Sequence, residues 1–442
     1  METVLLFILG ILIVVVGLAL SIGLHEIGHL IPAKRFGVRV SQYMIGFGPT
    51  LFSRRVGETE YGLKAIPLGG YISMAGMFPP KRPGDGARSA TTSVFDTLVQ
   101  DARQASADTL VDVDEKRAFY RLPVFKRIVI MLGGPIMNLL LAVVLYAVVL
   151  MGFGMPQLST TIGSVSECVI PATSQSQECG PDDPAAPGSA AGLKPGDRIV
   201  SMNGAPIESW QQATEIIRAN PERDLTIVVD RDGAELTLTA VPALSERYVF
   251  ADDGTIVEDA NGDPVTAEVG FLGVGAATET VQQPITAVLP AVGDNIVRVA
   301  QVVVTLPQRL IDVAVVTFGP GERDPNGPIG VVGIGRLAGE VTSLTDVPIA
   351  DRAATLVGLL AQLNVALFVF NLIPLLPLDG GHVATAIWEA IRRGWAKLRG
   401  KPDPGPVDGA RFIPITLAVS AVLILMTLLL FIADIIKPIS IL

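Results

Sequence analysis

The sequence predicts a polytopic α-helical membrane protein with four transmembrane helices, a membrane-associated β-rich loop and an inserted extracytoplasmic α+β domain. Half of the 442 residues (50%) are hydrophobic, and the mean hydropathy of +0.51 is too high for a soluble protein of this length. Four apolar stretches approach the roughly 20 residues that cross a lipid bilayer. A long segment with strand and turn patterns separates the second stretch from the third. The four stretches are residues 4–24, 128–152, 353–373 and 412–434.

The first apolar stretch ends in the motif His25-Glu26-Ile27-Gly28-His29. Residues i and i+4 share a helix face, so both imidazoles can bind one metal ion while Glu26 reaches a water molecule beside it. The alternative is a pair of helix-end histidines that face lipid headgroups. Ionisable groups at membrane depth are costly and usually functional, which favours the metal site. No cleaved signal peptide is expected, because no basic residue precedes the apolar run and the metal motif follows where a cleavage site would be.

Two different segments follow the first span. Residues 37–78 are rich in glycine and β-forming residues, as in Gly46-Phe47-Gly48-Pro49, which predicts short strands joined by turns. Residues 79–118 are polar, charged and poor in aromatic residues, so we expect a flexible cytoplasmic insertion.

The second span contains small and polar residues that an ordinary lipid-facing helix does not need. Gly133-Gly134-Pro135 permits close packing of helices, and Asn138 needs a hydrogen-bond partner inside the membrane. A role in helix packing alone remains an equal alternative for these residues.

The distribution of charge predicts the orientation. Residues 34–127 and the loop from Arg392 to Arg411 are rich in Lys and Arg, and such loops stay in the cytoplasm. Residues 154–351 are rich in Asp and Glu, so we expect them outside the cytoplasm, together with both termini of the chain. The net charge of -10 comes mainly from this external part, and without a nucleic-acid motif no nucleic-acid partner is expected.

Residues 159–276 are predicted to form a separate folded unit. Gly192-Leu193-Lys194-Pro195-Gly196-Asp197 is a turn that leads into a strand, and it resembles the corresponding turn of PDZ domains. Such domains offer a sheet edge to which an extended peptide adds as a strand. The other predicted elements are a hairpin turn at Asn203-Gly204, a helix over 210–219, and strands over 225–229 and 234–240 joined at Asp232-Gly233.

The two cysteines, Cys168 and Cys179, both fall in this external unit. Outside the cytosol such a pair can form a disulfide that closes a short loop, although two unpaired thiols remain possible. Zinc binding by the pair is not expected, because no histidine or further cysteine is nearby. The Pro-rich stretch from Cys168 to Ser189 departs from a compact PDZ domain.

Between this unit and the third span, the pattern predicts amphipathic helices that lie along the outer face of the membrane. Apolar residues recur with helical period from Ile285 to Phe318, and Pro290 and Pro307 should break the pattern. The Gly-rich residues 327–335 then lead to the third span.

A third metal ligand is expected in the third span, because a catalytic zinc site usually has three protein ligands and a water. Residues 371–382 place two prolines and two glycines around Asp379. Helix-breaking residues are tolerated at membrane depth only inside protein or beside a water-filled cavity, so Asp379 is the best candidate. It could instead cap the helix that follows. For His382 we expect a structural or ligand-supporting role rather than direct ligation.

Together, the His25 to His29 motif, the Gly-Gly-Pro and Asn138 of the second span, the PDZ-like unit and residues 371–380 resemble the site-2 protease family of intramembrane zinc metalloproteases. The single-PDZ layout is most similar to bacterial members that cleave anti-sigma factors. The resemblance implies a Zn²⁺ cofactor and substrates that are single-pass membrane proteins of the anti-sigma-factor type. It also implies the following roles: metal ligation by His25, His29 and Asp379, general base catalysis by Glu26, and substrate binding by Asn371, Gly69, Gly70 and Tyr71.

The resemblance implies a plasma-membrane protein organised in nine segments. These are a first transmembrane helix with the metal motif (1–36), a β-rich loop (37–78), a cytoplasmic insertion (79–118), a second transmembrane helix (119–153), a PDZ domain (159–276), an amphipathic juxtamembrane region (280–350), a third transmembrane helix with the metal-ligand loop (351–395), a cytoplasmic loop (396–411) and a fourth transmembrane helix (412–436).

The sequence argues against two functions other than proteolysis. A non-proteolytic scaffold that binds partners through its PDZ domain would tend to lose Glu26 or a ligand, whereas the whole set is present. A metal transporter would carry acidic or histidine residues in several spans, which this sequence lacks. An intramembrane zinc endopeptidase that works towards the cytoplasmic side is therefore the prediction.

Overall fold

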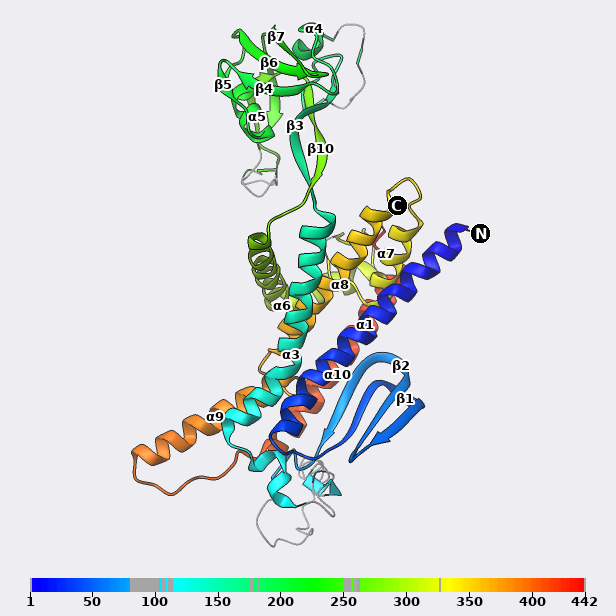
Figure 1. The fold of residues 1–442 in the computed structure, drawn as a ribbon, viewed down its shortest axis with the longest axis vertical. Helices are drawn as coiled ribbons and strands as arrows, with labels where there is room; N and C mark the ends of the chain where they lie inside the picture. Colours follow the sequence, from blue (N-terminus) through cyan, green and yellow to red (C-terminus); the bar gives the residue numbers. More distant parts are fainter. Residues whose placement is uncertain are drawn as a thin grey trace. The chain divides into compact units, whose positions relative to one another are not determined.

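The structure is a computed structural model that describes most of the chain in two compact units. One unit comprises Met1–Phe153 and Gln283–Leu442, and the other comprises Gly154–Gln282 (Figure 1). Most of the predicted insertion at residues 79–118 lies outside the described residues. The described residues are 2–79, 103–104, 106, 108–109, 114–174, 179–180, 183–249, 256–257, 259, 263–325 and 327–440.

The first unit is a bundle of apolar helices. Long runs of Leu, Ile and Val form its apolar helices, a form that satisfies every backbone hydrogen bond within the segment, as lipid requires. In the described part of the chain, five helical segments are long and apolar enough to cross a membrane. The helices of this unit are α1 (Glu2–Arg35), α3 (Val124–Ala147, continued by a π-helical turn at Val148–Phe153), α6 (Val288–Phe318), α7 (Val331–Ser343), α8 (Ile349–Asn371), α9 (Asp379–Leu398) and α10 (Ile413–Ile436).

The fifth candidate is α6, where the sequence predicted amphipathic helices broken at two prolines. The break is wrong, because α6 is one helix from Val288 to Phe318. Pro290 lies in the first turn, where backbone N–H groups have no partner within the helix. Pro307 is inside the helix and exposed, and the residues one turn to either side of it are not buried. The helix therefore tolerates the one hydrogen bond that Pro307 removes.

Small residues set the close approach of the helices. A Cβ atom on Gly10 of α1 would lie 2.2 Å from the carbonyl oxygen of Ala338 in α7. A Cβ on Gly28 of α1 would lie 2.2 Å from the carbonyl oxygen of Gly133 in α3. Both crossings therefore bring backbone against backbone, as is common where small residues meet in membrane helices.

The predicted β-rich loop is a twisted antiparallel sheet of two long strands, β1 (Val40–Val56) and β2 (Thr59–Met74). Both strands bend, so that residues Tyr43 to Ile45 pair with residues 70–72 on one side and 61–63 on the other. In the described chain, the part of β2 from Gly70 to Met74 has no further strand beyond it. This part is therefore an edge of the sheet.

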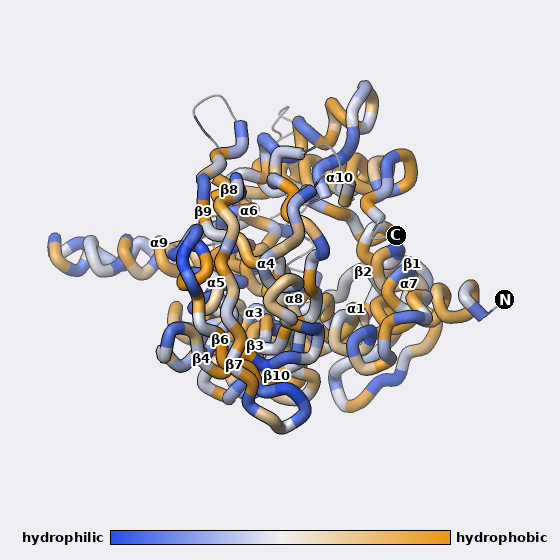
Figure 2. The backbone as a smooth tube through the Cα atoms, turned by 90° about the horizontal axis from the view of Figure 1, so that it is seen from above, coloured by the Kyte–Doolittle hydropathy of each residue, from blue (hydrophilic) through white to orange (hydrophobic). Residues whose placement is uncertain are grey.

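α9 differs from the apolar helices of this unit because it contains both hydrophobic and hydrophilic residues. Hydrophobic and hydrophilic residues alternate along it in Figure 2. Trp388 and Trp395 are more than half exposed, while Glu389 between them is fully buried. This pattern is typical of a helix at a membrane interface.

In its described residues, the second unit contains antiparallel strands and two helices around its own apolar core. Ile162, Met202, Leu225 and Ile227 are at the centre of that core. The helix predicted at 210–219 and the strand predicted at 234–240 coincide with α5 and β7. The elements are β3 (Met155–Val165), α4 (Pro187–Ala190), β4 (Arg198–Met202), β5 (Ala205–Pro206), α5 (Trp210–Ala219), β6 (Leu225–Arg231), β7 (Ala234–Ala240), β8 (Ala243–Tyr248), β9 (Thr266–Phe271) and β10 (Val274–Val281).

The strands of this unit form a sheet in the order β10-β3-β4-β6-β7 and a separate antiparallel pair, β8-β9. The predicted tight turns are present, with positive φ at Asn203 (48°) and Asp232 (55°), each followed by a glycine. The expected disulfide between Cys168 and Cys179 is also present.

Candidate metal centre

The His25 to His29 motif lies in the last part of α1, where the helix packs against α3. His29 is 4% exposed, and its Nδ1 donates to the carbonyl oxygen of Ile130 in α3 at 2.7 Å. A hydrogen bond of this kind fixes the tautomer and leaves a lone pair on Nε2. The second ring nitrogen of His29 is therefore available to a metal ion.

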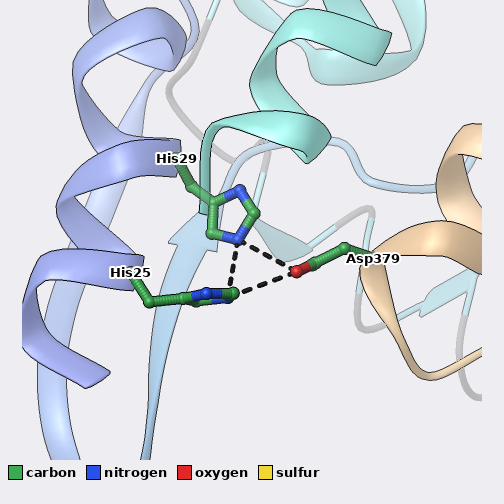
Figure 3. A group of neighbouring side chains, drawn as sticks. All are labelled: His25, His29 and Asp379. Atoms are coloured by element: carbon green, nitrogen blue, oxygen red, sulfur yellow. Dashed lines mark hydrogen bonds and ion pairs between the residues drawn. The ribbon is translucent and has the colours of Figure 1, made fainter. Parts of the chain in front are cut away.

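Three side chains converge at this point (Figure 3). The Nε2 atoms of His25 and His29 are 3.1 Å apart. Oδ2 of Asp379 lies 3.2 Å from Nε2 of His25 and 3.4 Å from Nε2 of His29. Lone pairs of two imidazoles and a carboxylate that face one point repel each other unless a cation lies between them. Two nitrogen ligands and one carboxylate suit zinc, so the donor set fits this metal.

The loop between α8 and α9 positions Asp379. α8 ends at Asn371, and α9 begins at Asp379 itself. A Cβ atom on Gly380 would lie 2.4 Å from the carbonyl oxygen of Leu372, and one on Gly381 would lie 2.5 Å from the backbone nitrogen of Leu376. The two glycines therefore let the loop fold back tightly on the start of α9. No side chain caps this helix, so Asp379 does not act as its N-cap.

α3 closes the other side of the three ligands through Gly134. A Cβ atom at this position would lie 2.3 Å from Nε2 of His29 and 2.7 Å from Nε2 of His25. These distances are shorter than any stable contact. Only glycine therefore leaves the imidazole nitrogens where they are.

Gly134→Ala is expected to lower zinc affinity by about 10- to 100-fold, because overpacking of this size typically costs roughly 1–3 kcal/mol. The measurement is zinc per purified chain across a chelator titration. The matched control is Gly358→Ala in α8, where an added Cβ meets nothing within 4 Å. Equal zinc retention by the two variants would contradict the described packing.

Glu26 and the edge of the β sheet lie against each other. Glu26 is 8% exposed, and it is not one of the three converging ligands. A Cβ atom on Gly70 would lie 2.9 Å from Cγ of Glu26 and 2.9 Å from Ile22 of the same helix. Gly70 therefore passes directly beside α1 at Glu26, with Gly69 and Tyr71 on either side of it in β2, and the hydroxyl of Tyr71 donates to Gln42.

Two residues singled out in the sequence are not among the converging ligands. Nδ2 of Asn371 donates to the carbonyl oxygen of Leu367 at 3.0 Å, one turn back in α8. His382 is one turn into α9 and does not belong to the group formed by His25, His29 and Asp379.

One buried ion pair that supports the site was not predicted. Nη2 of Arg127 in α3 donates to Oε1 of Glu389 in α9 at 2.5 Å, and Glu389 is fully buried. The other carboxylate oxygen accepts from the backbone of Val407 at 2.9 Å. The pair ties the helix that carries Asp379 to the helix that contacts both histidines. Glu389 is the one acid of α9 besides Asp379, among apolar and basic residues, and this was the only signal for the pair.

The polar contact between Asn364 and Ser21 was missed as well. Both side chains are buried, and Nδ2 of Asn364 donates to the hydroxyl of Ser21 at 2.9 Å. Ser21 precedes His25 by one helical turn, so this bond ties α8 to α1 next to the metal ligands.

Comparison with known proteins gives a consistent result. The model of peptidase family M50 matches residues 13–402. The zinc metalloprotease Rip1 of Mycobacterium tuberculosis is 33% identical over 98% of this chain and 99% of its own length. The metalloprotease MmpA of Caulobacter vibrioides is 29% identical over 87% of this chain and 88% of its own length. The zinc metalloprotease RasP of Bacillus licheniformis is 28% identical over 83% of this chain and 87% of its own.

These matches cover the helices that carry all three converging ligands, and the relatives are named as metalloproteases, Rip1 and RasP as zinc metalloproteases. The zinc cofactor and the protease activity expected from the sequence are confirmed. The chain therefore belongs to peptidase family M50, the site-2 protease family of membrane zinc metalloproteases.

Proposed function

We propose that the protein is an intramembrane endopeptidase that cleaves the transmembrane segments of single-pass membrane proteins. Its proposed substrates are proteins of the anti-sigma-factor type that a first protease has already cut. The observation that carries this proposal is the convergence of His25, His29 and Asp379 beside Glu26, within a bundle of membrane helices.

Each side chain has a separate chemical role in the proposal. His25, His29 and Asp379 would hold the zinc ion, which supplies Lewis-acid chemistry to water and to the peptide carbonyl. Glu26 accepts the proton of the attacking water and returns a proton to the leaving amide nitrogen. The low exposure of Glu26 keeps bulk water away from this transfer. The bond from His29 to Ile130 holds the imidazole in its metal-binding orientation.

The proposed substrate lies extended along the sheet edge. A transmembrane helix hides its carbonyl groups in its own hydrogen bonds, so it must unwind before attack. The edge formed by Gly69, Gly70 and Tyr71 offers backbone partners to an unwound strand, and it passes beside Glu26. Asn371 would contact the same strand after exchanging its bond to Leu367. Substrates with helix-destabilising residues should therefore be cleaved best.

We propose that four helices cross the membrane and that α6 lies along its outer face. The backbone before α6 donates from Gln283 to Leu150, at the end of α3, and Lys437 at the end of α10 donates to Gly319 after α6. α7 links this end of α10 to the first half of α1. The backbone of Gly330, just before α7, donates to Asp434 in α10, and the hydroxyl of Thr342 in α7 donates to the carbonyl oxygen of Leu6 in α1. Both ends of α6 are thus tied to the end of the bundle away from the histidines. Figure 1 is consistent with this, since α6 is strongly foreshortened there next to α3, which is seen along its length.

In the proposed orientation the basic loops lie in the cytoplasm, while both termini and the second unit lie outside. The metal centre is then towards the cytoplasmic side, because α1 reaches His25 and His29 late in its course. We propose that the second unit is a PDZ domain that rejects substrates until their ectodomains are trimmed. Its α5 helix and the Gly192 to Asp197 turn support that assignment.

The function is tested by comparing membrane proteomes of cells that carry the wild-type protein or Glu26→Gln. Single-pass proteins that have lost their ectodomains are expected to accumulate only in the variant. Complementation with the wild-type gene should remove them. If no trimmed protein accumulates, the proposed place of this enzyme after a first protease is wrong.

A further inference from the structure

α9 has a stripe of exposed apolar side chains along one face. Its members are separated by three or four residues, so they share that face, and each is more than half exposed. Glu389 is fully buried on another face, where its ion pair with Arg127 holds α9 against α3. The stripe therefore points away from the rest of the unit. It consists of Trp388, Ile391, Trp395 and Leu398.

The position of α9 in the chain places the stripe at a membrane surface. α9 follows α8 and precedes α10, and both of these helices are long and apolar enough to cross a membrane, whereas α9 is not. The backbone of Val407 donates to Glu389, so the chain that leads into α10 folds back along α9. In Figure 1 the far end of α9 projects sideways from the bundle. α9 thus connects the ends of two candidate membrane helices on one side of the bilayer.

Unpaired positive charges gather at the far end of the stripe. Lys397, Arg399 and Lys401 are exposed, and none of them forms an ion pair with a carboxylate in the part of the chain that the structure describes. Arg393, nearer the bundle, is different because it pairs with Glu389 and Asp403. The guanidinium carbon of Arg399 lies 4.5 Å from the centre of the Trp395 ring, so this cation is directly beside the stripe.

This combination of side chains fits the surface layer of a bilayer. A helix with an apolar face and flanking Lys or Arg residues lies in the plane of the interface, with its apolar face among the acyl chains. Indole rings favour the same level, and long basic side chains reach outwards to the headgroups. Clustered cations on such a helix attract anionic phospholipids in preference to neutral ones. The partner that the stripe and its cations fit together is therefore an anionic lipid surface.

We propose that α9 binds anionic phospholipids of the surrounding bilayer, with its stripe among the acyl chains and Lys397, Arg399 and Lys401 on the headgroup phosphates. These lipids hold the helix whose first residue is Asp379 at the membrane surface. The inference depends neither on the proposed substrates nor on which side of the membrane is cytoplasmic.

The tryptophans of the chain allow a local test. The sequence has three, Trp210, Trp388 and Trp395, so Trp210→Phe leaves only the two of the stripe. This variant is reconstituted in phosphatidylcholine vesicles that contain an equal small fraction of brominated phosphatidylglycerol or brominated phosphatidylcholine. Bromine on an acyl chain quenches tryptophan fluorescence on contact. The anionic lipid should quench as if enriched about fivefold, the factor for one Lys or Arg beside a charged surface, and salt should reduce this difference.

Replacing the three cations of α9 by glutamine together should make the two brominated lipids quench equally. Each comparison is between two lipids for one variant, so loss of the contact between Arg399 and the Trp395 ring cancels. The matched control makes the same change in net charge at three exposed cations of the second unit and should keep the preference. Those control positions are Lys194, Arg198 and Arg223.

Melting curves check that every variant folds. Equal quenching by the two lipids before the cations are replaced would overturn the proposal, because it would show no preference for the anionic headgroup. An absence of quenching by either lipid would show that the stripe lies outside the bilayer. A preference that survives replacement of all three cations would assign the headgroups to another site.

Discussion

Glu26→Gln is expected to reduce peptide-bond hydrolysis by about 10²- to 10⁴-fold, the usual contribution of a general acid–base group, while zinc stays bound. Glutamine has nearly the same shape as glutamate but cannot accept the proton of the attacking water. Glu26 is not one of the three converging ligands, so its replacement leaves the ligand set intact. Activity and metal content should therefore separate in this variant.

Cleavage of a co-expressed single-pass substrate, followed on gels, gives the first measurement, and zinc per chain gives the second. Glu2→Gln is the matched control, because it makes the same change at the exposed start of the same helix. Its cleavage rate should equal that of the wild type. Retained cleavage by Glu26→Gln would remove Glu26 from the mechanism, and loss of zinc would show that it also ligates the metal.

The sequence predicted the core of the site because its signals are local. The His25 to His29 spacing places two imidazoles on one helix face whatever the rest of the fold does. The prolines and glycines around Asp379 mark a break in an apolar helix, and the structure has α8 end and α9 begin there. The turns at Asn203-Gly204 and Asp232-Gly233 were equally visible, since positive φ angles select these residues.

Features that depend on distant partners could not be predicted. Arg127 was visible at the start of a span, but its partner Glu389 is 262 residues away in the sequence. The carbonyl of Ile130 that orients His29 belongs to an ordinary apolar residue. The continuity of α6 was not visible either, because a proline pattern does not show whether a long helix continues past the one hydrogen bond that Pro307 removes. For the ion pair and for His29, tertiary packing supplies what the local pattern lacks.

Asp379→Ala is expected to lower zinc affinity by more than roughly 100-fold, the upper range for loss of a group that only supports a ligand. The variant removes the carboxylate that lies 3.2 Å and 3.4 Å from the two imidazole nitrogens. Two histidines alone leave a zinc ion one protein ligand short of a catalytic site. Zinc content and cleavage should therefore fall together, in contrast to Glu26→Gln.

Two further variants separate ligation from general disruption of the helices. Asp351→Ala removes an acid from the first turn of α8, far along the chain from the metal loop, and should keep both zinc and activity. His382→Ala removes the one other imidazole near Asp379 and should retain far more zinc than Asp379→Ala, because His382 is outside the converging group. The opposite order, with zinc kept by Asp379→Ala and lost by His382→Ala, would make His382 the third ligand. Both residues lie at the start of α9, so melting curves show whether either substitution disturbs that helix, and a difference in zinc between equally stable variants identifies the ligand.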